Sequence, residues 1–229
     1  MASQPMRITV SENGPYLVEG GVPISKQIIG TNDKGESVDW IEGESLPLRP
    51  RYRLCRCGHS GHKPFCDGTH ATIDFDGTET ASREPYVDQA VIFEGPGLVM
   101  RDVDILCARA RFCQPCGTVW EELNDTDRPE VVAQVTQQVC NCPSGRLVVY
   151  DKATGEAIEA DLPKSIGVVE DPAKGISGPL WVRGGIQVVS SDGYEYEVRN
   201  RVTLCRCGQS KNKPFCDGTH MTIHFRDDQ

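Results

Sequence analysis

Two stretches of the chain carry the same four residues, of the types that bind soft metal ions. The sequence CRCGHSGHKPFCDGTH occupies residues 55–70, and CRCGQSKNKPFCDGTH occupies residues 205–220. Both follow the spacing C-x-C-x8-C-x3-H, and their flanking residues also agree, so the chain holds one chemical group twice. The candidate ligands are Cys55, Cys57, Cys66 and His70 in the first set and Cys205, Cys207, Cys216 and His220 in the second.

The spacing within each set favours two pairs of ligands. Residues two apart in an extended chain point the same way, so a modest turn brings both thiolates of C-x-C onto one iron. Residues four apart on a helix share a face, so the third cysteine and the histidine can hold a second iron. Basic residues add positive charge beside this anionic group: Arg56, Lys63, Arg206, Lys211 and Lys213. Two irons with two protein ligands each are what a 2Fe-2S cluster requires.

Two other chemistries use the same residue types. Three thiolates and one imidazole also form a structural zinc site, so a zinc-stapled interaction module is the alternative from another functional class. Zinc sites usually contain C-x2-C, however, rather than C-x-C. A disulfide between Cys55 and Cys57 would close a very small, strained ring. The spacing therefore favours an iron-sulfur cluster.

Both stretches resemble the CDGSH iron-sulfur domain of the mitoNEET family. The family pattern C-x-C-x2-(S/T)-x3-P-x-C-D-G-(S/A/T)-H is complete in each, with Ser60 and Pro64, and again Ser210 and Pro214, at the intermediate positions. The resemblance implies one 2Fe-2S cluster per set, with the C-x-C pair on one iron and the cysteine and histidine pair on the other. Family members with one motif form homodimers with a shared β-cap. A chain with two motifs therefore implies an intramolecular pseudo-dimer around a pseudo-twofold axis.

The single histidine in each set predicts how the cluster behaves. Neutral imidazole in place of a thiolate removes one negative charge and raises the reduction potential. Imidazole also titrates near neutral pH, so such a cluster becomes labile as the pH falls. Electron transfer and cluster transfer both follow from these properties. The remaining histidines are expected to be surface polar residues, because the other repeat has different residues at their positions: His59, His62 and His224.

Five further cysteines lie between the two sets, in CARARFCQPC at residues 107–116 and VCNCPSGRL at residues 139–147. The C-x5-C pair with a distant C-P-S-G-x-L resembles the divergent single-cluster 4Fe-4S ferredoxin-like domain. On that resemblance Cys107, Cys113 and Cys142 are ligands of a third cluster, with Cys116 or Cys140 as the fourth ligand. Buried free thiols, or a disulfide such as Cys113 with Cys140, are the alternatives.

The repeat also predicts how the chain is organised. GPYLVEGGVPI at residues 14–24 matches GPLWVRGGIQV at residues 178–188, which extends the similarity beyond the cysteines. Frequent Gly and Pro favour short strands and turns, so we expect an α+β, β-rich fold. Its predicted parts are an N-terminal CDGSH half, an inserted ferredoxin-like α+β unit and a C-terminal CDGSH half, at residues 1–86, 87–165 and 166–229.

Local patterns predict individual elements. DRPEVVAQVTQQV at residues 127–139 has the period of a helix capped by Asp127, with Val131, Val132, Val135 and Val139 on one face. RLVVYDKATGEAI at residues 146–158 predicts a hairpin, and the alternating YEYEVRNRVTL at residues 194–204 predicts a strand. TNDKGESVDWIEGES at residues 31–45 is expected to be a surface loop.

Composition limits the partners. The chain has 229 residues and a net charge of −9, which argues against nucleic acid or an anionic membrane as its target. It shows neither a secretory signal nor an apolar membrane span, so a cytoplasmic protein is expected. An odd number of cysteines fits metal ligation in such a reducing compartment better than complete disulfide pairing.

The sequence contains no phosphate-binding loop and no nucleophile elbow, which argues against an independent enzyme. We expect a monomeric electron or cluster carrier that serves a redox or cluster-accepting protein partner. An alternative is the redox subunit of a larger oxidoreductase. Residues 40–50 and the exposed histidine edges are then the predicted docking face.

Overall fold

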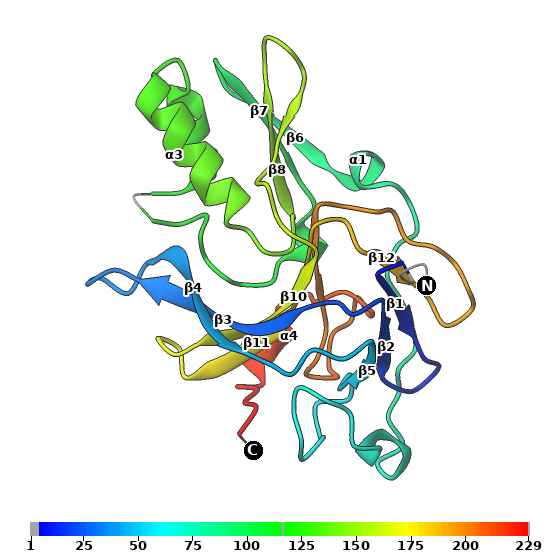
Figure 1. Ribbon diagram of the computed structural model, residues 1–229. Coiled ribbons are helices and arrows are strands. Elements are labelled where there is room, and N and C mark those ends of the chain that lie inside the picture. Colours follow the sequence, from blue (N-terminus) through cyan, green and yellow to red (C-terminus); the bar gives the residue numbers. More distant parts are fainter. Residues whose placement is uncertain (1–4, 116, 229) are drawn as a thin grey trace.

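The computed structural model describes residues 5–115 and 117–228 and is rich in strands, with few helices (Figure 1). This confirms the α+β, β-rich class. The first sheet contains β1 (Arg7–Val10), β2 (Tyr16–Glu19), β5 (Arg51–Leu54) and β12 (Gln187–Val189), in the order β12-β1-β2-β5. The second contains β3 (Ile24–Thr31), β4 (Ser37–Ser45), β10 (Ser165–Asp171), β11 (Ile176–Arg183) and β13 (Arg201–Leu204), in the order β13-β11-β10-β3-β4.

Each half of the chain contributes strands to the sheet of the other, β3 and β4 from the N-terminal half and β12 from the C-terminal half. β1 pairs antiparallel with β2, and the next strand, β3, leaves to run parallel to β10, with Lys26 opposite Val168. In the same way β10 pairs with β11, and the next strand, β12, runs parallel to β1, with Val188 opposite Ile8. Each cysteine motif then follows a strand that pairs with the second strand of its own half, β5 with β2 and β13 with β11. Both sheets are therefore built from both halves.

One hydrophobic core serves both halves. Apolar residues alternate along β1, β2 and β5, so that one face of each is buried, whereas β11 and β13 are buried on both faces. The core contains Ile8 and Leu54 from the N-terminal half and Leu180 and Leu204 from the C-terminal half, all fully buried. The two cysteine motifs thus start from strands that a common core fixes in position.

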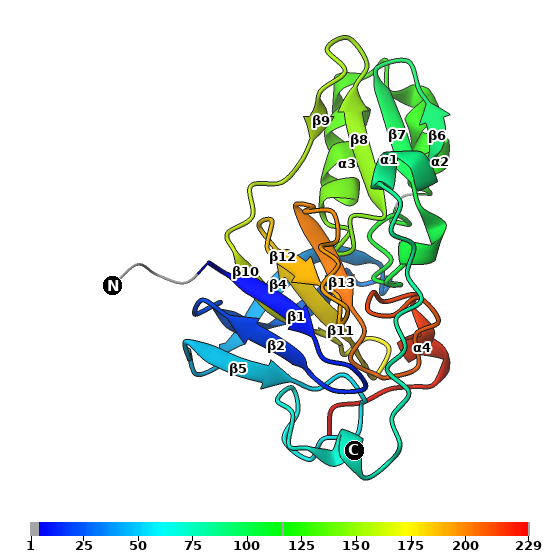
Figure 2. The ribbon, with the colours of Figure 1, turned by 90° about the vertical axis from the view of Figure 1, so that its right-hand side faces the viewer.

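Residues between the halves form a separate layer, with the long helix packed on a third sheet (Figure 2). This sheet has the order β6-β7-β8-β9, with β6 (Val91–Glu94), β7 (Leu98–Asp102), β8 (Leu147–Asp151) and β9 (Ala157–Ile158). The helix α3 (Pro129–Cys140) buries Val131, Val135 and Val139 against it, which confirms the predicted valine face. The predicted hairpin is β8 and β9. Short elements complete the described chain: η1 (Thr69–Ala71), α1 (Tyr86–Gln89), η2 (Asp104–Leu106), α2 (Val119–Glu122), η3 (Leu123–Asp125) and α4 (Thr219–Thr222).

Three local predictions were wrong. The expected surface loop at residues 31–45 contains β4, which pairs with β3 and places Trp40 against Phe112 and Trp181, with ring centroids 4.9 and 4.5 Å apart. The predicted strand at residues 194–204 is strand only from Arg201, as β13. Helix α3 is preceded by Arg128 rather than Asp127, because Pro129 already takes the first helical position.

The domain boundaries after residues 86 and 165 stay predictions. Among the described residues, no helix has the length and apolar character that crossing a membrane requires.

Candidate metal centres

The N-terminal motif presents its donors as two close pairs. Cys55 Sγ lies 3.7 Å from Cys57 Sγ, and Cys66 Sγ lies 3.4 Å from His70 Nδ1. The loop between the pairs folds back, because Cys55 N donates to Pro64 O at 2.8 Å and Cys66 N donates to Arg53 O at 3.0 Å. Strand β5 and this returning segment therefore hold the two pairs on one side of the loop.

The C-terminal motif repeats this geometry. The distance from Cys205 Sγ to Cys207 Sγ is 3.7 Å, and Cys216 Sγ lies 3.4 Å from His220 Nδ1. Cys216 N donates to Thr203 O at 2.9 Å, as its counterpart does in the first motif. The described residues contain no group of three or more Cys, His, Asp or Glu side chains gathered closely enough for one metal ion. Each motif thus offers two pairs of soft donors, which is the arrangement that fits two irons.

A capped turn, rather than a regular helix, joins the third cysteine to the histidine. The helical turns begin only at Thr69 and Thr219, after a glycine in the left-handed region, with φ 97° at Gly68 and 86° at Gly218. Asp67 Oδ1 accepts hydrogen bonds from the backbone N–H and the hydroxyl of Thr69. The expectation that the cysteine itself lies on a helix was therefore wrong, although the two donors do meet.

In each C-x-C pair the pKa of the first thiol is lowered, while the hydrogen bond to that thiol and burial raise the pKa of the second. A hydrogen bond from Cys57 holds the pKa of Cys55 at about 6, despite burial, and backbone N–H groups assist. The equivalent bond from Cys207 lowers the pKa of Cys205 to about 7. Burial raises the pKa of Cys66, and raises that of the fully covered Cys216 well above its ordinary range. One thiolate in each motif is thus prepared for metal before the metal arrives.

The two C-x-C turns lie directly against each other. A side chain at Gly58 would meet Cys207 O at 2.6 Å, and one at Gly208 would meet Cys57 O at 2.4 Å. Tyr16, from the N-terminal half, also donates its hydroxyl hydrogen to Cys205 O at 2.7 Å. These long-range contacts have no signal in the sequence beyond the repeated glycines.

The two motifs differ in what covers them. His70 is half-buried, and a side chain at Gly68 would meet nothing within 4 Å. His220 is 4 % exposed, and a side chain at Gly218 would meet Arg109 Cγ at 2.5 Å and Cys107 O at 2.8 Å. The cover on the C-terminal motif is thus the segment of residues 107–112, called the strap below. In Figure 2 α4 lies on the side of the molecule nearer the inserted layer.

An ion pair fastens the strap to the second sheet. Arg111 Nη1 lies 2.6 Å from the buried Asp171 Oδ2, at the end of β10. Both Arg109 and Arg111 have left-handed backbone angles, with φ 56° and 66°. Such angles are costly for arginine, so the strap is held by its surroundings rather than by its own preference.

The basic residues expected beside the clusters include two buried arginines. Arg206 donates to Gly178 O at 2.6 Å and Val169 O at 2.7 Å, and pairs with Glu170 and Asp227. Arg56 is 1 % exposed and is bonded to backbone oxygens of Ser11 and Gly77. Both brace the loops from within. The predicted surface histidines are confirmed as exposed: His59, His62 and His224.

Three of the middle cysteines face one small cavity of about 20 Å³, lined by Cys107, Cys113 and Cys142 with Arg146. Burial, assisted by the neighbouring Cys142 and Cys107, raises the pKa of Cys113 to about 12. Cys140 does not line the cavity, because its Sγ lies 3.8 Å from Ile158 O. Cys116, the other candidate for the fourth ligand, lies outside the described residues, and the described cysteines are free thiols. The proposed Cys113–Cys140 disulfide is therefore absent from the described chain.

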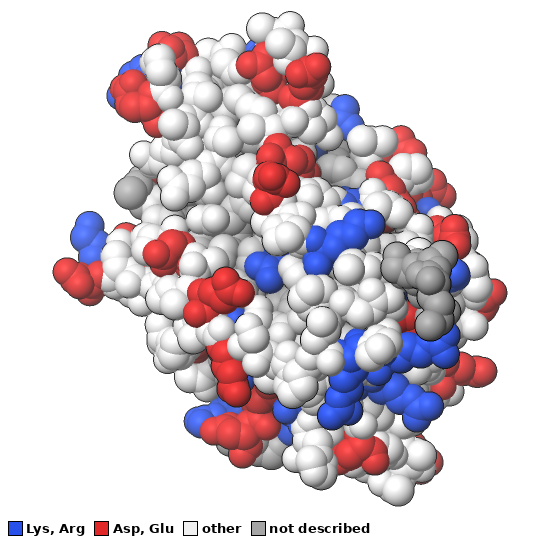
Figure 3. All heavy atoms as spheres, in the orientation of Figure 1, with Lys and Arg blue, Asp and Glu red and all other residues white. Residues whose placement is uncertain are grey.

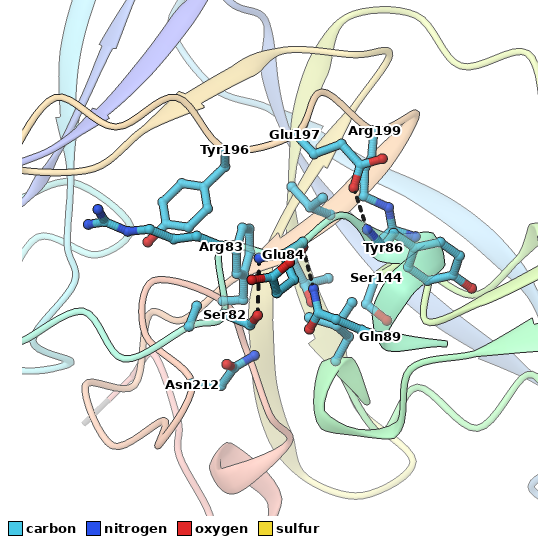
Figure 4. A pocket seen from close by; sticks show the side chains of 15 residues that line it. Ser82, Arg83, Glu84, Tyr86, Gln89, Ser144, Tyr196, Glu197, Arg199 and Asn212 are labelled. Atoms are coloured by element: carbon cyan, nitrogen blue, oxygen red, sulfur yellow. Dashed lines mark hydrogen bonds between the residues drawn. The ribbon is translucent and has the colours of Figure 1, made fainter. Parts of the chain in front are cut away.

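A cavity without cysteines lies beside the C-terminal motif (Figure 4). Its volume is about 50 Å³, and its lining includes Tyr86, Tyr196, Arg199, Thr203, Asn212 and Phe215. Asn212 Nδ2 and Thr203 Oγ1 are buried and have no hydrogen-bond partner among the described residues. The cavity is separate from both donor sets.

Comparison with known families finds models that match the regions containing these donor sets. Residues 13–71 and 177–221 match the family model described as an iron-binding zinc finger of CDGSH type. Residues 93–152 match the model described as a divergent 4Fe-4S mono-cluster. No curated protein and no solved structure matches the chain.

Proposed function

We propose that this chain, which carries two CDGSH iron-binding regions around a divergent 4Fe-4S region, is an iron-sulfur carrier for electrons or clusters. Each CDGSH motif holds a 2Fe-2S cluster through three cysteines and one histidine. The middle site holds a 4Fe-4S cluster on Cys107, Cys113 and Cys142, with Cys116 as the fourth ligand. The chain works as a cytoplasmic monomer without a catalytic site of its own, on a redox or cluster-accepting protein.

The observation that carries this proposal is the pairing of donors. In both motifs a thiol pair 3.7 Å apart and a thiol and imidazole pair 3.4 Å apart occur on one loop. Two ligands for each of two irons is the requirement of a 2Fe-2S cluster, whereas zinc in a structural site draws four donors around one ion. When bound, such a cluster accepts and releases one electron.

The residues of the chain supply the rest of the chemistry. The low pKa of Cys55 and of Cys205 provides thiolate ligands near neutral pH. Gly218 N lies 3.4 Å from Cys216 Sγ and donates to it, and such N–H donors favour the reduced, more negative state. Each histidine contributes a neutral donor where a fourth cysteine would add negative charge. These features favour a higher potential than four cysteines would give.

We also propose that the halves form an intramolecular pseudo-dimer with a shared β-cap. The reciprocal strands β3 and β12 support it, as do the reciprocal contacts of Gly58 with Cys207 and Gly208 with Cys57. A twofold relation explains why each contact occurs in two copies. The sheets, the core and the two motifs then follow one symmetry, while the inserted layer breaks it.

Anaerobic analysis of iron, sulfide and zinc in the purified protein, with its visible spectrum, tests the cofactors. The proposal predicts about eight irons per chain, four in the two CDGSH motifs and four in the middle site. About four irons would show that the middle site holds no cluster. Zinc without iron would contradict the proposal and favour an interaction module.

Substitution of each histidine tests the ligand assignment. His70→Cys and His220→Cys are each expected to lower the reduction potential of their own motif and to slow its loss of cluster in acid. Voltammetry and the decay of visible absorption at low pH measure both effects. Unchanged values in both variants would contradict the assignment of the histidines as ligands.

A further inference from the structure

Each of the two cysteine motifs is preceded by a pair of arginines, and the two pairs occupy equivalent positions in the repeat. RPRYRLCRC at residues 49–57 aligns with RNRVTLCRC at residues 199–207, so Arg49 corresponds to Arg199 and Arg51 to Arg201. Strands β5 and β13 hold the second arginine of each pair at their first residue. In both halves the first arginine lies over an aromatic ring and the second pairs with a glutamate. The halves differ in burial and in the contacts that Arg199 and Arg201 make with the insert.

In the C-terminal half, Arg201 binds the inserted layer through hydrogen bonds and an ion pair. It is 1 % exposed, and its Nε donates to Cys142 O at 2.7 Å while Nη2 donates to Val139 O at 3.0 Å. It also pairs with the Glu159 carboxylate. Val139 and Cys142 lie at the C-terminal end of α3, where backbone carbonyls carry partial negative charge, and both oxygens also accept backbone bonds, from Cys142 N and Gly145 N. Arg201 thus binds a helix end and a carboxylate at once.

Arg199 adds further contacts to the same interface with the insert. Its guanidinium donates to Gly145 O, three residues beyond Cys142, and lies 3.9 Å from the centre of the Tyr86 ring. Figure 4 shows Arg199 beside Tyr86 at this junction. The two arginines therefore receive the part of the insert that carries one of the middle cysteines.

In the N-terminal half the corresponding surface faces solvent. Arg49, Arg51 and Arg53 are exposed, as is Leu48, which is 66 % exposed. The Arg51 side chain pairs with Glu19 at 3.1 Å and is still 64 % exposed. Figure 3 shows basic side chains gathered over the region of β2 and β5, on a chain whose net charge is −9. These four residues, Leu48, Arg49, Arg51 and Arg53, are called the arginine face below.

The arginine face adjoins the more open of the two CDGSH motifs. β5 leads directly into Cys55, and Arg53 O accepts the hydrogen bond from Cys66 N. A protein seated on this face would therefore lie beside the N-terminal donor set. The insert has the same relation to the C-terminal donor set, where Cys107 O lies close to Gly218.

We propose that the arginine face docks an acidic redox protein, in the way that Arg199 and Arg201 dock the insert. The partner presents the same chemistry as the insert, a helix end whose carbonyls carry partial negative charge together with a carboxylate. Charge complementarity with a concentrated basic face on an acidic chain selects such a partner over a basic one. Only the redox character of the partner rests on the proposed function. The arginine face overlaps the docking face predicted at residues 40–50 only at Leu48 and Arg49, and it continues into β5.

Direct binding tests this surface, with a plant-type 2Fe-2S ferredoxin as the acidic probe and cytochrome c as the basic probe. Calorimetric titration is carried out at an ionic strength of about 0.01 M, where screening is weak. The test variant is Arg49→Glu/Arg51→Glu, and Arg49→Gln/Arg51→Gln guards against misfolding caused by the glutamates facing Glu19. The matched control is Arg128→Glu/Arg226→Glu, which changes net charge equally at two other exposed arginines.

The acidic ferredoxin is expected to bind the wild-type chain and the control variant with similar affinity. Binding should weaken about tenfold or more in the glutamate variant and by a smaller factor in the glutamine variant. An equal loss in the control, no binding to the wild-type chain, or tighter binding of cytochrome c at this face would overturn the proposal.

Sedimentation of the wild-type chain alone tests whether a second copy of the chain binds the arginine face. A dimer that disappears in the glutamate variant would show that a second copy occupies the face, and this also contradicts the proposal. Iron and sulfide content, measured on the same samples, separates a failed docking surface from a failed cofactor assignment.

Discussion

The two CDGSH motifs have the same donor distances but opposite access to solvent. The N-terminal motif ends in a half-buried His70, next to a Gly68 with open space around it. The C-terminal motif ends in His220, 4 % exposed, under a strap that contacts Gly218. Local sequence therefore sets the geometry of the donors, and long-range packing determines how accessible the donors are to solvent. The cysteine and histidine pair of the N-terminal motif is therefore the more accessible of the two.

The largest difference is expected at the equivalent arginines that begin β13 and β5. Arg201→Met leaves the Glu159 carboxylate and several backbone carbonyls without their cation, so it should lower the free energy of unfolding by about 3–5 kcal/mol. Arg51→Met, at an exposed position, should change it by no more than about 0.5 kcal/mol. Urea unfolding of both variants measures the difference. Similar losses would contradict the unequal packing of the two halves.

The equivalent glycines give the next largest contrast. Alanine in a left-handed conformation costs about 1–2 kcal/mol, so Gly68→Ala should lose about that much. Gly218→Ala adds a clash with Cys107 O and the Arg109 side chain, which should bring the loss to about 2–4 kcal/mol. Thermal unfolding of the two variants measures it. If Gly218→Ala proves as mild as Gly68→Ala, the strap does not press on the C-terminal motif.

The cover over His220 predicts a pH effect in the metal-free protein. Burial, assisted by the Arg206 charge, lowers the pKa of His220 from 6.5 to about 4. Between these values the unfolded chain binds a proton that the folded chain does not. The contribution of His220 to stability is therefore fully present above pH 6.5 and is lost, by up to about 3 kcal/mol, as the pH drops towards 4.

Urea unfolding of the metal-free protein across this range checks the effect. His220→Gln should remove that part of the pH dependence, and His70→Gln tests whether it belongs to the covered motif alone. An unchanged slope in His220→Gln would rule out burial of this imidazole as its source.

Local features of the molecule were predictable, and long-range ones were not. The donor sets, the valine face of α3 and the β8–β9 hairpin follow from short patterns, because neighbouring residues alone determine them. The pairing of β3 with β10 and the contact of Gly58 with Cys207 join residues far apart in the sequence. A single sequence carries no direct signal for such contacts.

The same limit explains one error and one choice that the sequence left open. Trp40 and its neighbours form β4 because they pack against aromatic rings from other segments, whereas the local residues Asn32, Asp33 and Gly35 resemble a loop. The sequence left Cys116 or Cys140 as the fourth ligand beside Cys142, and only the end of α3 turns Cys140 towards Ile158 instead of the cavity.

The most direct test of unequal access measures cluster loss from each motif separately. Cys216→Ser/His220→Ala leaves the N-terminal donor set, and Cys66→Ser/His70→Ala leaves the C-terminal set. Each protein is incubated anaerobically with an excess of an iron chelator while its 2Fe-2S absorption is followed. A covered site must open first, and an opening cost of only about 1.4 kcal/mol slows loss tenfold. Cluster loss from the N-terminal motif is expected to be at least tenfold faster than from the C-terminal motif. Equal rates, or faster loss from the C-terminal motif, would contradict the unequal access of the two motifs.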